Sequence, residues 1–132
     1  MNRIRQEIRK SMVYLKNVSA TETEAKFIFD EDFIGFKGHF PGRPVLPGVC
    51  KIQAALVIYE EKNNSQPQLK EIVSAKFFSP VSVNDELIFK YQEERLCQDV
   101  LVKVKVSVNN NKVAQIHLTV ANGGKESLSV NV

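Results

Sequence analysis

The chain has 132 residues, 43% of them hydrophobic and 25% charged, which predicts a single globular domain over residues 1–132. Its formal net charge of +3 is too small to indicate nucleic-acid binding. The longest apolar run, 54–59, is far shorter than the roughly 18 residues that a membrane span needs.

The N-terminus and the cysteines point to the cytoplasm. Residues 1–10 contain no apolar stretch of the kind that signal peptides carry. Cys50 and Cys97 are too few for a disulfide framework or a metal site. A reducing compartment is the simplest setting for two such thiols, so we expect a cytoplasmic protein.

The N-terminal part predicts a short helix and two strands. Residues 3–10 place Ile4 and Ile8 one turn apart among helix formers, which indicates an amphipathic helix. Strands are expected over 12–18 and 24–29, and a loop follows the second one. That second strand places three apolar side chains on one face: Ala25, Phe27 and Phe29.

Residues 38–53 combine a histidine with three prolines and three glycines. Each proline fixes φ and removes a backbone donor, so we expect an extended, rigid loop up to Leu46. A helix then begins at Pro47 and Gly48. A rigid loop that holds His39 directly before a helix N-terminus is a setting suited to chemistry.

The helix that begins at Pro47 is apolar nearly all round, which indicates a buried helix. Asparagines and a proline over 63–67 predict its end. Cys50, in its first turn, could be mildly acidified by the helix N-terminus, but nothing else activates it. We therefore interpret Cys50 as a small buried hydrophobe.

Beyond the helix the sequence predicts only strands, over 72–78, 86–93, 100–108 and 112–121. His117 alternates with polar residues and is expected to face solvent. One buried helix with five or six strands predicts an α+β fold, in which an antiparallel sheet curls round the helix. The exposed edge strands of such a sheet favour pairing into a dimer.

Three cations surround the proline-rich loop, Lys37, Arg43 and Lys51, and no carboxylate occurs from residue 35 to residue 53. This local positive charge would attract an anionic partner. A solvated surface explains the same three residues, and charge alone does not decide between the two interpretations.

Two blocks of sequence resemble those of the hot-dog-fold (3R)-3-hydroxyacyl-acyl-carrier-protein dehydratases. The family pattern G-H-F-P-G-x-P, followed by P-G-V, is matched by residues 38–49 without a gap. The pattern K-F-x-x-P-V, followed by D-E-L, is matched by 76–81 and 85–87. The resemblance implies a hot-dog fold and dehydration of a 3-hydroxyacyl thioester to the trans-2-enoyl thioester, in fatty acid or specialised lipid or polyketide biosynthesis.

The resemblance also assigns catalytic roles. His39 would be the base that removes the α-proton, while its other ring nitrogen donates to the carbonyl of Val45. Gly48 would offer a backbone N–H to the oxyanion that forms at the thioester carbonyl. The family's acid, fourteen residues after the histidine, falls on Gln53, whose amide can orient the leaving hydroxyl but cannot protonate it.

Gln53 leaves three functions open. We favour an active dehydratase, in which His39 carries the proton from the α-carbon to the leaving hydroxyl while Gln53 positions that hydroxyl. The alternative is a non-catalytic subunit that binds acyl carrier protein or partners an active paralogue. An acyl thioesterase fits less well, because Gln53 supplies no carboxylate. Glu60 and Glu61 lie too far along the helix to replace the acid within one subunit.

The surroundings of the site follow from the same resemblance. Five apolar residues are candidates for lining an acyl tunnel: Phe40, Leu46, Val49, Phe77 and Phe78. Plain core packing would explain the same residues. The loop at Gly42 and Val45 would also contact substrate. Lys37, Arg43 and Lys51 would contact the carrier protein or the phosphate of its 4′-phosphopantetheine, which carries the substrate. No metal or other cofactor is implied, because the reaction is proton transfer. Each family site lies at a homodimer interface, and dimers can assemble into hexamers as trimers of dimers.

Overall fold

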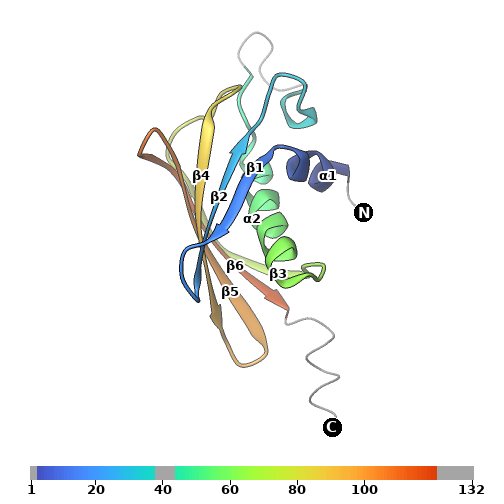
Figure 1. The fold of residues 1–132 in the computed structure, drawn as a ribbon, viewed down its shortest axis with the longest axis vertical. Coiled ribbons are helices and arrows are strands. Elements are labelled where there is room, and N and C mark those ends of the chain that lie inside the picture. The colour runs from blue at the N-terminus through green and yellow to red at the C-terminus, as the bar shows by residue number, and fades with distance from the viewer. Residues whose placement is uncertain (1–2, 38–43, 122–132) are drawn as a thin grey trace.

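A computed structural model describes residues 3–37 and 44–121, which form a six-stranded antiparallel sheet curled round a long helix (Figure 1). The elements are α1 (Arg3–Lys10), β1 (Met12–Asn17), β2 (Glu22–Ile28), a 3₁₀ turn (Ile34–Phe36), α2 (Gly48–Asn63), β3 (Leu69–Phe77), β4 (Glu86–Arg95), β5 (Asp99–Val108) and β6 (Asn111–Ala121). The predicted α+β class and hot-dog architecture are confirmed.

The ends of α2 follow from local chemistry. Pro47 precedes the helix with an extended backbone, φ −62° and ψ 148°, and its fixed φ suits that position. At the other end Asn64 has a left-handed conformation, φ 52°, and its N–H donates to the carbonyl of Glu60. Asparagine tolerates this conformation, so Asn64 closes the last turn as the sequence predicts.

The strand order in the sheet is β1-β2-β4-β5-β6-β3. β3 follows α2 directly in sequence but pairs with β6, with Ile72 opposite Leu118. β1 and β3 therefore form the two edges. The connection through α2 carries the chain across the concave face of the sheet, and this crossing places the helix inside the curl (Figure 1).

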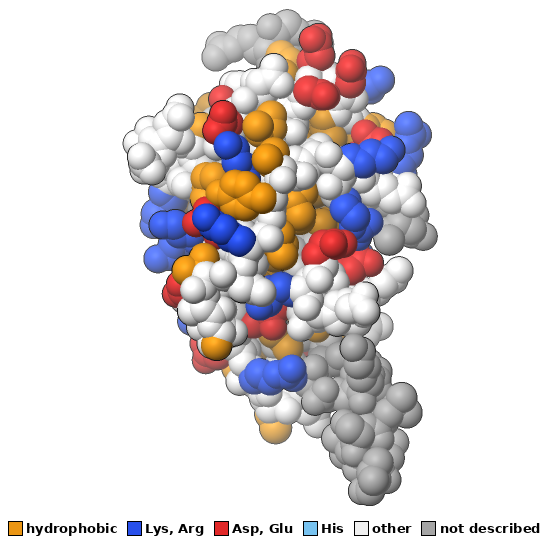
Figure 2. Space-filling model, in the orientation of Figure 1, with side chains coloured by type: hydrophobic (Ala, Val, Ile, Leu, Met, Phe, Trp, Pro, Cys, Tyr) orange, Lys and Arg blue, Asp and Glu red, His pale blue; other side chains and the backbone are white. Residues whose placement is uncertain are grey.

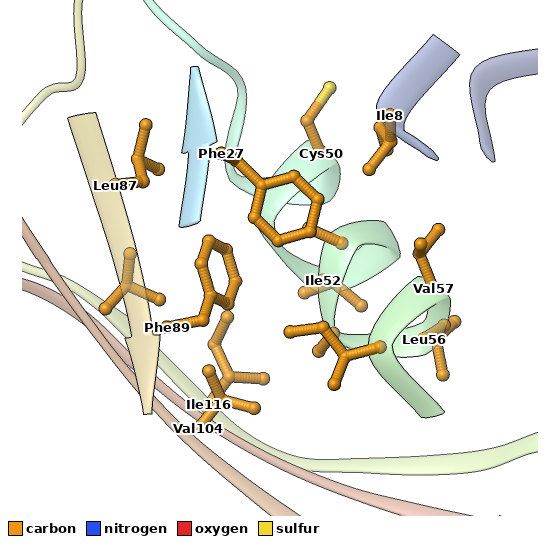
Figure 3. Close-up of a cluster of buried hydrophobic side chains, with 14 of the residues drawn as sticks. Ile8, Phe27, Cys50, Ile52, Leu56, Val57, Leu87, Phe89, Val104 and Ile116 are labelled. Carbon is orange, nitrogen blue, oxygen red and sulfur yellow. The ribbon is translucent and has the colours of Figure 1, made fainter. Parts of the chain in front are cut away.

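Alternate residues of the strands fill the space between the sheet and α2. Phe27 and Phe89 meet edge to face, with ring centroids 5.0 Å apart, and both are fully buried. Figure 3 shows these rings between the strands and α2, while Ile8 of α1 approaches the helix from the other side. The predicted inward face of Ala25, Phe27 and Phe29 is confirmed. On β4 and β5 the residues with at most 1% exposure include Leu87, Tyr91, Val102, Val104 and Val106.

α1 packs against α2 through both apolar and ionic contacts. Ile8 is fully buried. Arg9 forms two ion pairs with α2, from Nη2 to Glu60 at 2.7 Å and from Nε to Glu61 at 2.8 Å. These contacts fix the short helix on the longer one.

Some elements differ from the sequence-based expectation. β2 begins at Glu22 and β3 at Leu69, earlier than the predicted residues 24 and 72, because pairing with β4 and β6 extends both strands. The expected loop before the proline-rich segment contains a 3₁₀ turn, whose Phe36 packs in the core. Cross-strand pairing and burial therefore override weak local patterns at these positions.

The surface carries charges of both signs. Figure 2 shows acidic and basic side chains interspersed over one face, around a group of hydrophobic side chains. No helix in the ranges 3–37 and 44–121 is both long and apolar enough to cross a membrane. The larger exposed apolar side chains along the β3 edge are Leu69, Ile72, Val73, Phe77 and Phe78.

Leu56→Ala tests whether α2 is the centre of the core. Leu56 is fully buried, so we expect the free energy of unfolding to fall by about 2–5 kcal/mol, from lost apolar burial and the cavity left behind. Urea denaturation measures this loss. The control is Val13→Ala on the β1 edge, where Val13 is 54% exposed and the change should stay within about 0.5 kcal/mol. Equal effects would contradict the central position of α2.

Candidate active site

The loop that precedes α2 is fixed in place by backbone contacts with residues 81 and 82. The N–H of Leu46 donates to the carbonyl of Val81 at 2.8 Å, and Val45 forms an isolated bridge with Ser82. No side chain caps the helix at Pro47. The first backbone N–H groups of a helix have no partner within it, and the helix dipole is positive at that end. The N–H of Gly48 therefore suits an oxygen that gains negative charge.

Phe77 of β3 covers this helix end. A Cβ atom added to Gly48 would lie 2.8 Å from Cζ of the Phe77 ring, closer than real Cβ contacts. A side chain at residue 48 would therefore displace the Phe77 ring, and glycine is the residue that lets the ring lie against the helix end. The ring is 45% exposed, so it forms a wall of the site and is not part of the core.

A pocket of about 290 Å³ opens between the start of α2 and the end of β3. It brings together six of the predicted site residues from two distant parts of the sequence: Val45, Leu46, Gly48, Lys51, Phe77 and Phe78. Ser79 and Pro80 complete the lining. Leu46 is almost fully buried, whereas Phe78 is 52% exposed. The two matched sequence blocks therefore meet at one place.

Lys51 is buried beneath this pocket. Lys51 is only 3% exposed, and its Nζ donates to the carbonyl of Leu46 at 3.4 Å. Nζ also lies 5.2 Å from the centre of the Phe77 ring, within the range of a cation–π contact. Burial lowers the pKa of Lys51 from its ordinary value. Lys37, in contrast, is exposed.

Gln53 lies on another side of α2. At 100° per residue, Gln53 is about 200° round the helix from Lys51, so it faces away from the pocket. Its Oε1 accepts a hydrogen bond from Nε of Arg5 at 2.7 Å. Val49, one turn earlier on the same side, is 59% exposed. Within one chain the structure therefore separates Gln53 from Gly48 and the pocket.

Arg5 contacts a predicted site residue, Gln53, and sequence reasoning missed it. Two arginines one turn apart on α1, Arg5 and Arg9, face polar residues of α2. That spacing was visible in the sequence, but nothing there indicated which helix α1 would meet. The ion pairs of Arg9 with Glu60 and Glu61 also show that these carboxylates already have partners in the structure.

Four predicted site residues, His39, Phe40, Gly42 and Arg43, lie outside the described residues. The described chain resumes at Pro44, next to the pocket-lining Val45. The predicted base and part of the predicted substrate contacts therefore remain predictions.

The side chains of Cys50 and His117 do not line this pocket. Cys50 is buried, as predicted, and burial raises the pKa of its thiol to about 11, opposite to the mild acidification that we considered. His117 lies on the outward face of β6, half-buried, beside a shallow hollow on the sheet. Within 3–37 and 44–121, no three His, Cys, Asp or Glu side chains gather closely enough to hold a metal ion.

Known proteins are similar to this chain in sequence and in fold. The family model of the ApeI-like dehydratases matches residues 15–120. A 3-hydroxyacyl-[acyl-carrier-protein] dehydratase FabZ from Wolbachia sp. subsp. Drosophila simulans is 35% identical over 114 residues, covering 80% of this chain and 72% of the relative. A FabZ from Fusobacterium nucleatum is 31% identical over 96 residues, covering 68% and 67%.

Solved structures with the same fold include the ApeI:P dehydratase heterocomplex from Xenorhabdus doucetiae, with a TM-score of 0.75, 19% identity and coverage of 84% of this chain and 96% of that one. The PaaI protein of E. coli also matches, with a TM-score of 0.62, 10% identity and coverage of 85% and 82%. At these identities the structures establish the fold. Together with the sequence matches, they identify this chain as a hot-dog-fold member of the ApeI-like dehydratase family.

Proposed function

We propose that this chain dehydrates (3R)-3-hydroxyacyl thioesters of acyl carrier protein to the trans-2-enoyl thioesters, in fatty acid or specialised lipid or polyketide biosynthesis. The observation that carries the proposal is the pocket at the start of α2, where both family blocks meet around the N–H of Gly48. The relatives of this chain named as 3-hydroxyacyl-[acyl-carrier-protein] dehydratases support the same reaction class.

The first step is removal of the α-proton. A thioester carbonyl bound at Gly48 would receive a hydrogen bond from the helix N–H, which stabilises the enolate that forms. His39 takes the proton on one ring nitrogen, because an imidazole with a pKa near 6.5 is largely neutral at physiological pH. The acyl chain extends along the pocket walls formed by Phe77 and Phe78.

The second step is loss of the β-hydroxyl. The C–O bond breaks as the enolate electrons form the new double bond, and the hydroxyl leaves as water once it has received a proton. Gln53 cannot supply this proton, because an amide is not an acid at physiological pH. His39, now protonated, returns the same proton, and Gln53 holds the leaving oxygen in position.

A homodimer would assemble this site. Gln53 and the pocket lie on different sides of α2 in one chain, so the base of one subunit would meet Gln53 of the other. The β3 edge supports such pairing, since an edge strand with exposed Ile72 and Val73 presents both unpaired backbone groups and apolar surface. Three dimers could then assemble into a hexamer.

Residues 1–132 act as one hot-dog domain in the cytoplasm. The substrate arrives on the 4′-phosphopantetheine of acyl carrier protein, and proton transfer requires no metal or other cofactor. Lys37 and Arg43 contact the carrier protein or the phosphate, while buried Lys51 lies beside the pocket, where the end of the arm would enter.

A non-catalytic subunit is the second candidate function. The amide of Gln53 at the acid position favours it, since a chain that only binds acyl carrier protein needs no proton donor. The solved ApeI:P structure, which has this fold, is described as a dehydratase heterocomplex, and that description is compatible with a role as a partner subunit. A thioesterase is less suitable, because Gln53 cannot act as a carboxylate nucleophile or base.

Turnover of a 3-hydroxyacyl-carrier-protein separates these functions. We expect the wild type to form the enoyl product and His39→Ala to lose at least about a hundredfold in kcat, since it removes the proposed base. Mass spectrometry of the carrier-bound product measures this. His117→Ala, on the outward face of β6, is the matched control and should keep full activity. An inactive wild type would support the non-catalytic subunit.

Lys37→Gln and Arg43→Gln test the carrier-protein contact. Each variant should raise the KM for acyl carrier protein several-fold and leave the KM for a short 3-hydroxyacyl thioester unchanged, because only the carrier is strongly anionic. Steady-state kinetics with both substrates measure the difference. Lys105→Gln, an exposed lysine on the outer face of the sheet, is the control. Equal losses on both substrates would exclude a specific carrier contact.

Ile72→Lys tests the dimer. Ile72 is 46% exposed on the β3 edge, and a charge there should convert the dimer into a monomer with reduced turnover. Light scattering after size-exclusion chromatography measures the molecular mass. Val13→Lys is the matched change on the opposite edge, where Val13 is 54% exposed, and should leave the mass unchanged. A monomeric wild type at micromolar concentration would refute the pairing.

A further inference from the structure

The contact between Arg5 and Gln53 fixes the orientation of an amide in the candidate site. Nε of Arg5 lies 2.7 Å from Oε1 of Gln53. The N–H of a guanidinium can only donate, so the acceptor must be the amide oxygen. The assignment of oxygen and nitrogen in Gln53 therefore rests on the chemistry of Arg5.

The surrounding contacts hold Arg5 in place. α1 is fixed on α2 by buried Ile8 and by the two ion pairs of Arg9, one turn beyond Arg5. Gln53 lies about two turns before Glu60 on α2, on the same side of that helix. Arg5 and Arg9 therefore reach two successive polar positions along one side of α2.

The nitrogen of the Gln53 amide is left facing outward. Within residues 3–37 and 44–121, Nε2 makes no hydrogen bond, and no buried polar side-chain atom lacks a partner. Nε2 is therefore accessible, on the side of α2 where Val49 is 59% exposed. Because Oε1 is already occupied, the residue presents two N–H donors to whatever approaches this side.

We propose that Arg5 is a positioning residue that holds the Gln53 amide as a hydrogen-bond donor to the leaving hydroxyl. This inference rests on the proposed dehydratase function. A departing oxygen gains negative charge, so N–H donors stabilise it and a carbonyl oxygen would repel it. The guanidinium charge at Oε1 also withdraws electrons from the amide, which strengthens its N–H donors. Without Arg5 the amide could rotate and present its oxygen.

The same contact explains why a glutamine can occupy the position of the family's acid. A carboxyl group at residue 53 would lie within hydrogen-bond distance of the Arg5 guanidinium. The positive charge would hold it in the ionised form, and a carboxylate has no proton to donate. An amide beside Arg5 keeps its donors at any physiological pH.

The kinetic test compares two arginine variants of α1. Arg5→Met should lower kcat roughly ten- to hundredfold with little change in KM for a short 3-hydroxyacyl thioester, since the lost orientation matters most as the hydroxyl leaves. Arg5→Lys should recover part of this loss, because Lys retains a donor and a charge. Arg3→Met is the matched control. Arg3 is an exposed arginine of the same helix, so its replacement should leave kcat within about twofold.

A second measurement reports on the contact without any turnover. In Gln53→Glu, the introduced carboxyl should titrate below the ordinary glutamate pKa of about 4.3, because Arg5 stabilises its ionised form. In Arg5→Met/Gln53→Glu its pKa should be higher by about one unit or more. Carbon-13 NMR of the labelled side-chain carboxyl follows both titrations.

The outcomes separate this inference from the proposed function. Equal pKa values in the two Gln53→Glu proteins would overturn the contact itself. A clear pKa difference with full turnover in Arg5→Met would overturn the positioning role. A clear pKa difference with an inactive wild type would show that the dehydratase proposal fails, and the catalytic role of Arg5 with it, while the contact stands.

Discussion

The burial of α2 inside the curled sheet is the constraint on which the candidate site depends. Nine of its sixteen residues are buried, and they lie on nearly every side of the helix. Any rotation or shift of α2 would expose apolar surface, so the helix has one stable position and orientation within the sheet. The functional positions are those that this burial leaves available: the N-terminus at Gly48 and the side that carries Val49 and Gln53.

Much of the fold could be predicted from local sequence patterns. Alternation predicted the inward face of β2, and the apolar residues on nearly every side of α2 predicted that this helix is buried. The start of β3 could not be predicted, because Leu69 and Lys70 show no alternation and join the strand only through β6. The order of strands in the sheet depends on such distant pairings, which no local pattern contains.

Residues of the candidate site could be predicted only where they belong to a continuous sequence motif. The residues around Gly48 follow from a continuous block, and Phe77 follows from a second block in the family's order. The burial of Lys51 was not predictable, since a lysine in an apolar helix resembles a surface cation in sequence. Arg5 was missed because 48 positions separate it from Gln53. Only the docking of α1 on α2 brings them together.

The contact between Gly48 and Phe77 has a consequence for the evolution of this protein. Space at the helix N-terminus is shared between a residue with no side chain and an aromatic ring from a strand far along the sequence. A larger residue at position 48 would require a smaller or displaced one at position 77. The residues at these two positions together therefore set how much room remains for an incoming acyl group.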